Sequence, residues 1–280
     1  MKRIENEQFK DERALYGVDD LELDGCEFKG GKEEQRALME ASNIRANKCL
    51  FDLKYPFWRA NNIKLNDVTM TEYCQAALWN TDNVFIEKSY LGGANALRVC
   101  ENVKIKDSTV LSPRFGWKNK NVEITNTKII SEYAFLDSEN IKADKINFQA
   151  KHGFQHVNEL SINNSVLKAK YAFWYSKNVV VTDSLLEGEY LGWYSENLTL
   201  IRCHIRGTEP LCYCKNLKLI DCTMAETNGA FEMSEVDATV KGNIVSVKNP
   251  LKGKIVAQSI TEVINDNSQA SCKIEIITKE

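Results

Sequence analysis

The sequence predicts an all-β protein, a parallel β-helix in which short strands recur along a single chain. The first observation is a phrase of similar sequence that returns every 19 residues. The second is an asparagine at the same position of most repeats, and the third is an alternation of apolar and polar residues just after it. A fixed period of this size is typical of proteins built from stacked turns, here called rungs.

The repeat is clearest between Glu101 and Asn140, where Glu-Asn-Val-Lys-Ile, Lys-Asn-Val-Glu-Ile and Glu-Asn-Ile follow one another at equal spacing. Upstream the series continues with one slip of about two residues, and Glu159 fills the one missed position. The asparagines in phase are Asn43, Asn62, Asn83, Asn102, Asn121, Asn140, Asn178, Asn197 and Asn216.

A single β-helix domain over residues 1–280 is expected, in three parts. Residues 1–13 are polar and are expected to cap the first rung, because an open end of stacked strands exposes apolar core and unpaired backbone groups. Residues 14–244 carry the array of about twelve rungs, with an exposed charged loop at 29–36. The register is lost from Val245, so residues 245–280 are expected to form a few closing strands.

Three apolar columns recur in each rung. Positions one and three after the asparagine are apolar with a polar residue between them, as in Val103 and Ile105, which indicates a strand with one buried face. A second column lies eight after the asparagine, and a third lies five before the next one, as in Phe154 and Phe173. Three short apolar segments per turn predict a prism with a packed interior.

The asparagine column has its own physical reason. A sharp corner between strands needs a residue that tolerates a left-handed backbone, and asparagine does so. Its amide is also expected to hydrogen-bond the asparagines of the rungs above and below. The column is therefore expected to be the inner ladder of the β-helix.

Most of the nine cysteines occupy positions that other rungs fill with serine, threonine or another small residue. Such interchange predicts small, inward, reduced side chains rather than a disulfide framework. A metal site is the alternative, but the spacing fits no zinc pattern, and no metal or cofactor is expected. The alternative set is Cys203, His204, Cys212, Cys214 and Cys222.

The asparagine ladder and the 19-residue rung resemble the pectin-lyase-like superfamily of right-handed parallel β-helices. More narrowly, the whole chain resembles a bacterial family of unknown function, number 3737, on repeats such as Lys177-Asn178-Val179-Val180-Val181 and Tyr171-Ala172-Phe173-Trp174. The superfamily resemblance implies a single-stranded right-handed β-helix and polysaccharide chemistry. The sequence lacks the catalytic motifs of pectate lyases and polygalacturonases, and a fold alone does not give a function.

One column could form a binding site. All five tryptophans lie four before the asparagine, and polar or aromatic residues fill the positions three and seven before it. Aromatic rings stack on the apolar faces of sugars while polar groups fix the hydroxyls, so this face is interpreted as a groove for an oligo- or polysaccharide. The candidate ligand-binding residues are Trp117, Trp174, Trp193, Tyr133, Tyr171, Tyr190 and Tyr194.

A uronate lyase or epimerase is one hypothesis for this groove. Arg114 and Lys118 would neutralise a uronate carboxylate. His156 or His152 would take the proton next to it, and Tyr175 or Tyr133 would return one. Asp137 would orient His156. Hydrolysis is disfavoured, because Asp137 has no evident second carboxylate on this face.

Two alternatives stay open. The aromatic column could be packing alone, because identical residues stack well, or an association surface of a scaffold that forms homo-oligomers. The formal net charge of −3 is spread through the chain, so no nucleic-acid partner is expected. The charged start and the lack of long apolar runs predict no membrane partner and a cytoplasmic location.

Overall fold

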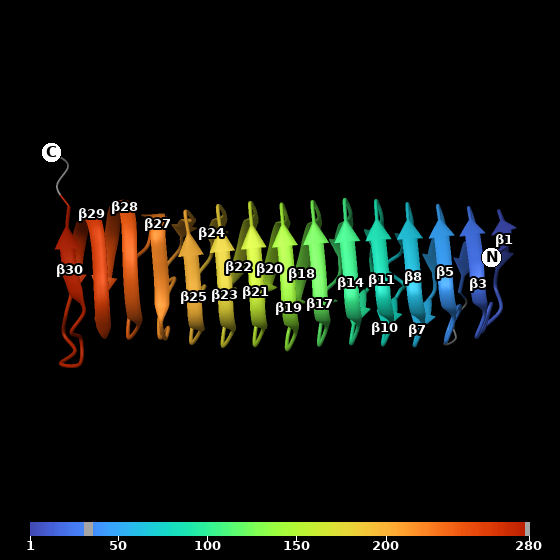
Figure 1. The fold of residues 1–280 in the computed structure, drawn as a ribbon, viewed down its shortest axis with the longest axis horizontal. Helices are drawn as coiled ribbons and strands as arrows, with labels where there is room; N and C mark the ends of the chain where they lie inside the picture. Colours follow the sequence, from blue (N-terminus) through green and yellow to red (C-terminus); the bar gives the residue numbers. More distant parts are fainter. Residues whose placement is uncertain (31–35, 278–280) are drawn as a thin grey trace. The chain divides into compact units, whose positions relative to one another are not determined.

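The structure is a computed structural model that describes residues 1–30 and 36–277. The chain comprises two compact units, Met1–Lys142 (the N-terminal unit) and Ala143–Glu280 (the C-terminal unit). Each unit is a stack of short strands that follow one another in chain order (Figure 1). The described residues contain no helix long and apolar enough to cross a membrane.

The strands of the N-terminal unit are two to seven residues long. They are β1 (Lys2–Glu5), β2 (Gln8–Phe9), β3 (Asp19–Asp24), β4 (Glu27–Lys29), β5 (Ser42–Asn47), β6 (Leu50–Asp52), β7 (Phe57–Trp58), β8 (Asn61–Asn66), β9 (Thr69–Met70), β10 (Leu78–Trp79), β11 (Asp82–Glu87), β12 (Tyr90–Leu91), β13 (Leu97–Arg98), β14 (Glu101–Lys106), β15 (Thr109–Leu111), β16 (Arg114–Phe115), β17 (Lys120–Thr125) and β18 (Lys128–Ala134).

The division between the units falls within β19 (Glu139–Asp144). The strands of the C-terminal unit lengthen toward its end. They are β20 (Asn147–His152), β21 (Asn158–Asn163), β22 (Val166–Lys170), β23 (Lys177–Thr182), β24 (Leu185–Glu187), β25 (Glu196–Ile201), β26 (His204–Arg206), β27 (Leu217–Ala225), β28 (Glu235–Lys248), β29 (Lys252–Ile264) and β30 (Lys273–Ile276).

Every described strand pair is parallel, and equivalent residues of neighbouring rungs lie side by side. Val84 of β11 pairs with Val103 of β14, and Val179 of β23 pairs with Leu198 of β25. Each pair is one 19-residue repeat apart, so the repeat in the sequence is the turn of the solenoid. Each unit is a right-handed parallel β-helix, as predicted, and the two together contain about fourteen turns.

The N-terminal segment is a rung rather than a cap. Strand β1 pairs with β3 and β2 pairs with β4, both in parallel. The Phe9 and Phe28 rings stack with their centroids 4.7 Å apart. Although residues 1–13 are polar, one apolar residue per strand is enough to join the column below, and so the regular array begins earlier than the sequence predicts. Residues 31–35 of the predicted loop at 29–36 lie outside the described residues.

Parallel pairing also continues beyond Val245. Glu235 of β28 pairs with Lys252 of β29, and Lys254 of β29 pairs with Lys273 of β30. The separation of paired residues changes between these two steps and the register shifts within β28, which explains why the repeat cannot be seen in this part of the sequence. The predicted closing strands are therefore further rungs; residues 278–280 lie outside the described residues.

The three apolar columns form the core. Val103, Val110 and Phe154, one from each column, are fully buried. In the third column Phe154 and Phe173 stack at 6.3 Å between ring centroids. Since each ring covers the next, a rung buries its apolar face only when its neighbours are present.

The asparagines form a hydrogen-bonded ladder, but it lies on the outside of the molecule. The Asn121 amide donates to Asn102 Oδ1 at 3.0 Å, and the Asn140 amide donates to Asn121 Oδ1 at 2.8 Å. The backbone of Asn121 is left-handed, with φ of 55°. The predicted conformation and bonding are confirmed, whereas the predicted inner position is wrong: these side chains are half-buried or exposed. A left-handed residue at a convex corner points its side chain away from the core.

The cysteines are free and, apart from the half-buried Cys272, buried. The Cys100 thiol donates to the carbonyls of Leu78 and Arg98, each at 3.3 Å. In an equivalent position, the Ser138 hydroxyl donates to the carbonyl of Gly116 at 2.7 Å. The interpretation as small inward side chains is confirmed, and it explains why cysteine and serine replace one another.

Candidate functional site

The residues three before the asparagine position adopt a left-handed backbone. In the C-terminal unit these are His156, Tyr175, Tyr194 and Tyr213, with φ between 53° and 57°. Tyr171 and Tyr190, seven before the asparagine, have φ of 52°. The bend turns these side chains outward, while the residue two positions earlier, such as Phe154 before His156, stays in the core. In a continuous strand, residues two positions apart would point to the same face.

Aromatic side chains on this wall of the C-terminal unit form three ladders, together called the aromatic surface. The rings of successive rungs stack because their residues occupy equivalent positions. The ladders are His152, Tyr171 and Tyr190; Trp174 and Trp193; and His156, Tyr175, Tyr194 and Tyr213.

The stacking is close to parallel. Tyr175 and Tyr194 have centroids 5.1 Å apart and planes 7° apart, and Tyr194 and Tyr213 have centroids 5.0 Å apart. The Trp174 and Trp193 rings are 5.8 Å apart, with 19° between their planes. Tyr175 is 47% exposed and Tyr194 is 40% exposed. The outermost ladder therefore presents ring edges and phenol hydroxyls to solvent, at the spacing of the rungs.

The aromatic surface ends in acidic residues. In the column of Tyr190, the next rung has Glu209. In the column of Trp193, the next rung has Cys212 and the rung after it has Glu232. One carboxylate oxygen each of Glu209 and Glu232 and the sulfur of Cys212 lie within 4.8 Å of one another. The Lys248 ammonium is 2.9 Å from Glu232. We call Glu209, Cys212 and Glu232 the acidic end of the aromatic surface.

The charges at the acidic end act on their neighbours. The Glu209 carboxylate, together with burial, raises the pKa of the Tyr190 phenol. Burial, with the neighbouring Glu232, raises the pKa of Tyr213. Burial and the charges of Glu209 and Glu232 raise the pKa of the Cys212 thiol, so this side chain is a neutral thiol at pH 7. Two carboxylates and a thiol are groups that could hold a divalent cation, but a thiol must first lose its proton to do so.

The tryptophans of the N-terminal unit are engaged by guanidinium groups. Trp58 and Trp79 stack at 5.0 Å, Arg36 lies over Trp58 and Arg98 lies over Trp79. Each tryptophan of this pair therefore has an arginine guanidinium over its ring. Trp117 lies under Arg114 and donates its indole N–H to the Tyr133 carbonyl at 3.0 Å.

The predicted proton-transfer residues divide between the two units. Arg114, Lys118 and Asp137 belong to the N-terminal unit, where all three are exposed. His152, His156 and Tyr175 belong to the C-terminal unit, where they are members of the aromatic ladders. The two groups belong to different units, so the complete catalytic set stays a prediction.

His152 has a defined hydrogen-bond partner. Its Nδ1 lies 2.8 Å from the Gln155 amide nitrogen, which donates to it. Burial, followed by the charges of Lys151 and Lys170, lowers the pKa of His152. The imidazole is therefore neutral at pH 7, with its Nδ1 lone pair engaged by the protein. His156 is exposed and packs against Trp174 and Tyr175.

Sequence reasoning did not select the acidic end. Glu209 and Glu232 occupy the aromatic columns in the sequence, and their replacement of a ring was the available signal. Lys170 was also missed: its ammonium lies over both Tyr171 and Tyr190, a contact that no sequence pattern indicates. Of the alternative metal set, Cys203 and Cys222 are buried and donate to backbone carbonyls, while His204 bonds the Thr223 hydroxyl.

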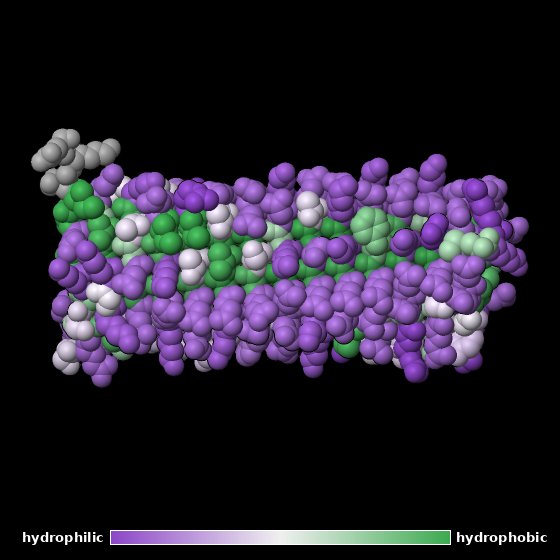
Figure 2. All heavy atoms as spheres, in the orientation of Figure 1, coloured by the Kyte–Doolittle hydropathy of each residue, from purple (hydrophilic) through white to green (hydrophobic). Residues whose placement is uncertain are grey.

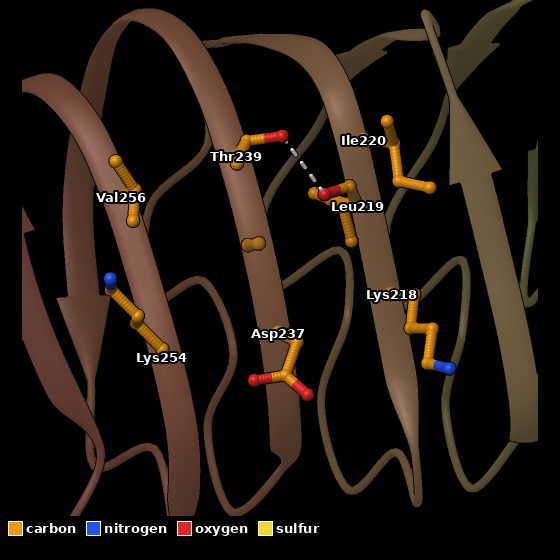
Figure 3. A pocket seen from close by; sticks show the side chains of 8 residues that line it. Lys218, Leu219, Ile220, Asp237, Thr239, Lys254 and Val256 are labelled. Atoms are coloured by element: carbon orange, nitrogen blue, oxygen red, sulfur yellow. Dashed lines mark hydrogen bonds between the residues drawn. The ribbon is translucent and has the colours of Figure 1, made fainter.

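A concave region lies elsewhere, on the outer face of β27 to β29. It is a shallow groove of about 360 Å³, with Ile220, which is 45% exposed, at one side and Lys218, Asp237 and Lys254 near it (Figure 3). Figure 2 shows apolar side chains gathered over the strands at the C-terminal end of the chain, amid a largely polar surface. The groove differs from the aromatic surface in its lining, which is aliphatic and charged.

Solved structures similar to this chain are β-helix proteins. An exopolygalacturonase from Thermotoga maritima is 9% identical, with 85% of this chain and 83% of that chain covered and a TM-score of 0.46. PfbA, a surface adhesin of Streptococcus pneumoniae, is 10% identical, with 94% and 81% covered and a TM-score of 0.44. The tailspike protein of Escherichia coli bacteriophage HK620 is 9% identical, with 91% and 61% covered and a TM-score of 0.49. Such likeness concerns the fold alone.

No curated protein matches the sequence. A family described as "Protein of unknown function (DUF3737)" matches residues 2–277. The match spans the rungs of both units and includes the asparagine ladder and the aromatic surface. The chain therefore belongs to the DUF3737 family.

Proposed function

We propose that the C-terminal unit binds an extended saccharide along the aromatic surface. The observation that carries this proposal is the ladder of Tyr175, Tyr194 and Tyr213, which stacks on the outside of the solenoid with two of its rings 40% or more exposed. A tyrosine offers a sugar both an apolar ring and a hydroxyl that donates and accepts hydrogen bonds. Repetition of these groups at each rung suits a ligand that is itself a repeating polymer.

The backbone supports a role beyond packing. A left-handed conformation costs a non-glycine residue about 1–2 kcal/mol, and asparagine tolerates it better than an aromatic residue does. Yet tyrosine occupies five such positions on this wall: Tyr171, Tyr175, Tyr190, Tyr194 and Tyr213. Ring contacts return about 0.5–1.5 kcal/mol per pair, so packing offsets this backbone cost. Packing makes no use of the phenol hydroxyls, whereas recognition of a sugar does.

Tryptophan fluorescence tests the proposal directly. Replacement of Trp58, Trp79 and Trp117 by phenylalanine leaves Trp174 and Trp193, both in the aromatic surface, as the emitters. Titration with neutral, acidic and amino oligosaccharides is expected to give a saturable change with at least one of them. Tyr194→Ala should abolish that change, and Tyr73→Ala, which removes a 66% exposed tyrosine in the N-terminal unit, should leave it intact. A flat response to every class of saccharide would overturn the proposal.

Self-association is a second candidate, favoured by the groove on β27 to β29. Its charged residues carry both signs, so two copies related by a two-fold axis can set Asp237 of one copy against Lys218 or Lys254 of the other. Ile220 would supply apolar contact at the centre. Sedimentation should then give a dimer that Ile220→Asp converts to a monomer, while Ile220→Thr weakens it. A monomer at all concentrations would eliminate this candidate and leave saccharide binding untouched.

A further inference from the structure

The aromatic surface changes charge along its length. In the column that holds Lys151 and Lys170, the next rung has Glu189. In the neighbouring column the rings of Tyr171 and Tyr190 are followed by Glu209. Each of these columns passes from a cationic or aromatic residue to a carboxylate in the same direction along the solenoid. The ladders therefore end in a region of negative potential.

The last rings of two ladders have a side that no further ring covers. The ring of Tyr171 stacks on the N-terminal side of Tyr190, and the ring of Trp174 stacks on the N-terminal side of Trp193. On the other side, within the described residues, the next rung supplies Glu209 and the much smaller Cys212 in place of rings. Inside a ladder the ring faces are taken by the neighbours, but at the acidic end a ligand can reach both a ring and a carboxylate.

A side chain of the protein already demonstrates the binding chemistry. The Lys170 ammonium lies 5.4 Å from the centroid of Tyr171 and 5.6 Å from that of Tyr190. It also pairs with Glu189 at 2.6 Å. An ammonium held by two aromatic rings and a carboxylate is the usual arrangement for recognising organic cations. One rung further, the residue equivalent to Lys170 is Glu189 and the residue equivalent to Glu189 is Thr208, so this column supplies no ammonium beside Glu209.

Glu209 is the carboxylate at this end that has no ion pair of its own within 4 Å among the described residues. Glu189 pairs with Lys170 and Glu232 pairs with Lys248. The charge of Glu209 acts at longer range on the Lys248 ammonium and raises the pKa of the Tyr190 phenol. The aromatic surface thus carries three carboxylates against two ammonium groups at this end. A uronate would meet repulsion here, whereas a cation would meet attraction.

We propose that the acidic end binds the protonated amine of an amino sugar, with Glu209 as its counter-ion and Tyr190 and Trp193 as its aromatic contacts. This inference rests on the proposed saccharide function and names the ligand class. It replaces the uronate hypothesis for this part of the surface. The sugar ring would extend from Trp193 toward Tyr194, where phenol hydroxyls are available for its hydroxyl groups.

Two oligosaccharides with the same linkage but different charge test whether the ammonium group is recognised. Glucosamine and N-acetylglucosamine oligomers of equal length have the same linkage, but only the former carry ammonium groups at about pH 6. In the fluorescence titration above, the glucosamine oligomer is expected to bind roughly tenfold more tightly, as a cation with aromatic and carboxylate partners should. Glu209→Gln should remove that difference by weakening glucosamine binding alone. Glu226→Gln, which changes an exposed carboxylate paired with Arg206, is the matched control and should change neither affinity.

The outcomes distinguish the two proposals. Equal affinities for the two oligomers, or tighter binding of oligogalacturonate, would overturn the amino-sugar inference and leave saccharide binding in place. Failure of every saccharide would overturn both. A second variant tests the site without removing a carboxylate: Lys170→Met frees the rings of Tyr171 and Tyr190 from the protein's own ammonium, and a roughly threefold gain in glucosamine affinity is expected. A loss of affinity in this variant would contradict the proposed binding mode.

Discussion

The rings of Tyr175 and Tyr194 stack 5.1 Å apart, and both residues hold left-handed backbones with φ of 53° and 56°. Two tyrosines thus occupy corners that would suit asparagine, and each is supported by the other. The solenoid makes this arrangement repeat, because equivalent corners lie directly above one another. The aromatic surface is a product of the fold as much as of its residues.

This relationship predicts that binding and stability can be separated at Tyr194. Tyr194→Asn removes three ring contacts, with Tyr175, Trp193 and Tyr213, each worth about 0.5–1 kcal/mol, and relieves a left-handed strain of about 1–2 kcal/mol. The net change in the free energy of unfolding is expected to be within about 1 kcal/mol of zero. Saccharide binding, followed by tryptophan fluorescence, should nevertheless be lost. Unchanged binding would show that the tyrosine ladder does not contact the ligand.

The asparagine ladder should contribute to stability through both its amide and its backbone. Asn121→Ala removes the bonds to Asn102 and Asn140 and places alanine at φ of 55°. A loss of about 2 kcal/mol is expected from denaturant unfolding. Asn121→Gly removes the same bonds but tolerates the backbone, so it should cost about 1 kcal/mol. Equal effects of the two variants would mean that the left-handed corner carries no penalty.

The buried cysteines should accept serine but not a larger apolar residue. Burial raises the pKa of the Cys100 thiol to about 12, so it acts as a neutral donor to two carbonyls. Cys100→Ser keeps the size and the donor and should change the free energy of unfolding by less than about 1 kcal/mol. Cys100→Val loses the donor and adds volume, and should cost about 2 kcal/mol.

Thermal unfolding of the Cys100 variants checks this prediction. The equivalent Ser138, which bonds the Gly116 carbonyl, provides the reverse exchange as a control: Ser138→Cys should also be tolerated. If the serine and valine variants of Cys100 melted together, the hydrogen bond to the neighbouring rung would have no part in the preference for small polar residues.

His152 should make stability depend on pH below about 6.5. Burial and the charges of Lys151 and Lys170 lower its pKa in the folded protein, so between the ordinary and the lowered pKa the unfolded chain binds a proton that the folded chain does not. The free energy of unfolding therefore falls as the pH drops through this window. His152→Gln should flatten that part of the melting-temperature profile.

The Lys170→Gln variant is the companion test for His152. Removing one of the nearby positive charges should raise the pKa of His152, as measured by NMR titration of its imidazole. A titration that does not move would assign the shift to burial and to Lys151.

Much of the fold could be predicted because the sequence repeats the same pattern of apolar and polar residues about every 19 positions. Val103 recurs as Val122, and Phe154 recurs as Phe173, since each rung must bury the same face against the next. The limits of the array could not be predicted in this way. At Lys2 and beyond Val245, pairing depends on backbone hydrogen bonds, which any sequence can supply, so strands form there without the repeat.

The candidate site was only partly predictable. The column of Trp174 and Trp193 is visible in the sequence, as is the neighbouring column of Tyr175 and Tyr194. Their outward direction depends on left-handed corners, which period alone does not reveal. The approach of Lys170 to two rings, and of Glu209 to Glu232, brings together side chains of different columns and depends on rotamers.

The β-helix, its rung length and the columns that fill its core follow from the amino-acid sequence, because burial in a stacked fold forces equivalent positions to share their chemistry. Which side chains face solvent became clear only in three dimensions. The tertiary structure places the asparagine ladder outside, turns the tyrosines of the C-terminal unit outward and sets Glu209 at the end of their ladders. Surface arrangement depends on local backbone bends and side-chain directions, and a repeating apolar pattern does not constrain these.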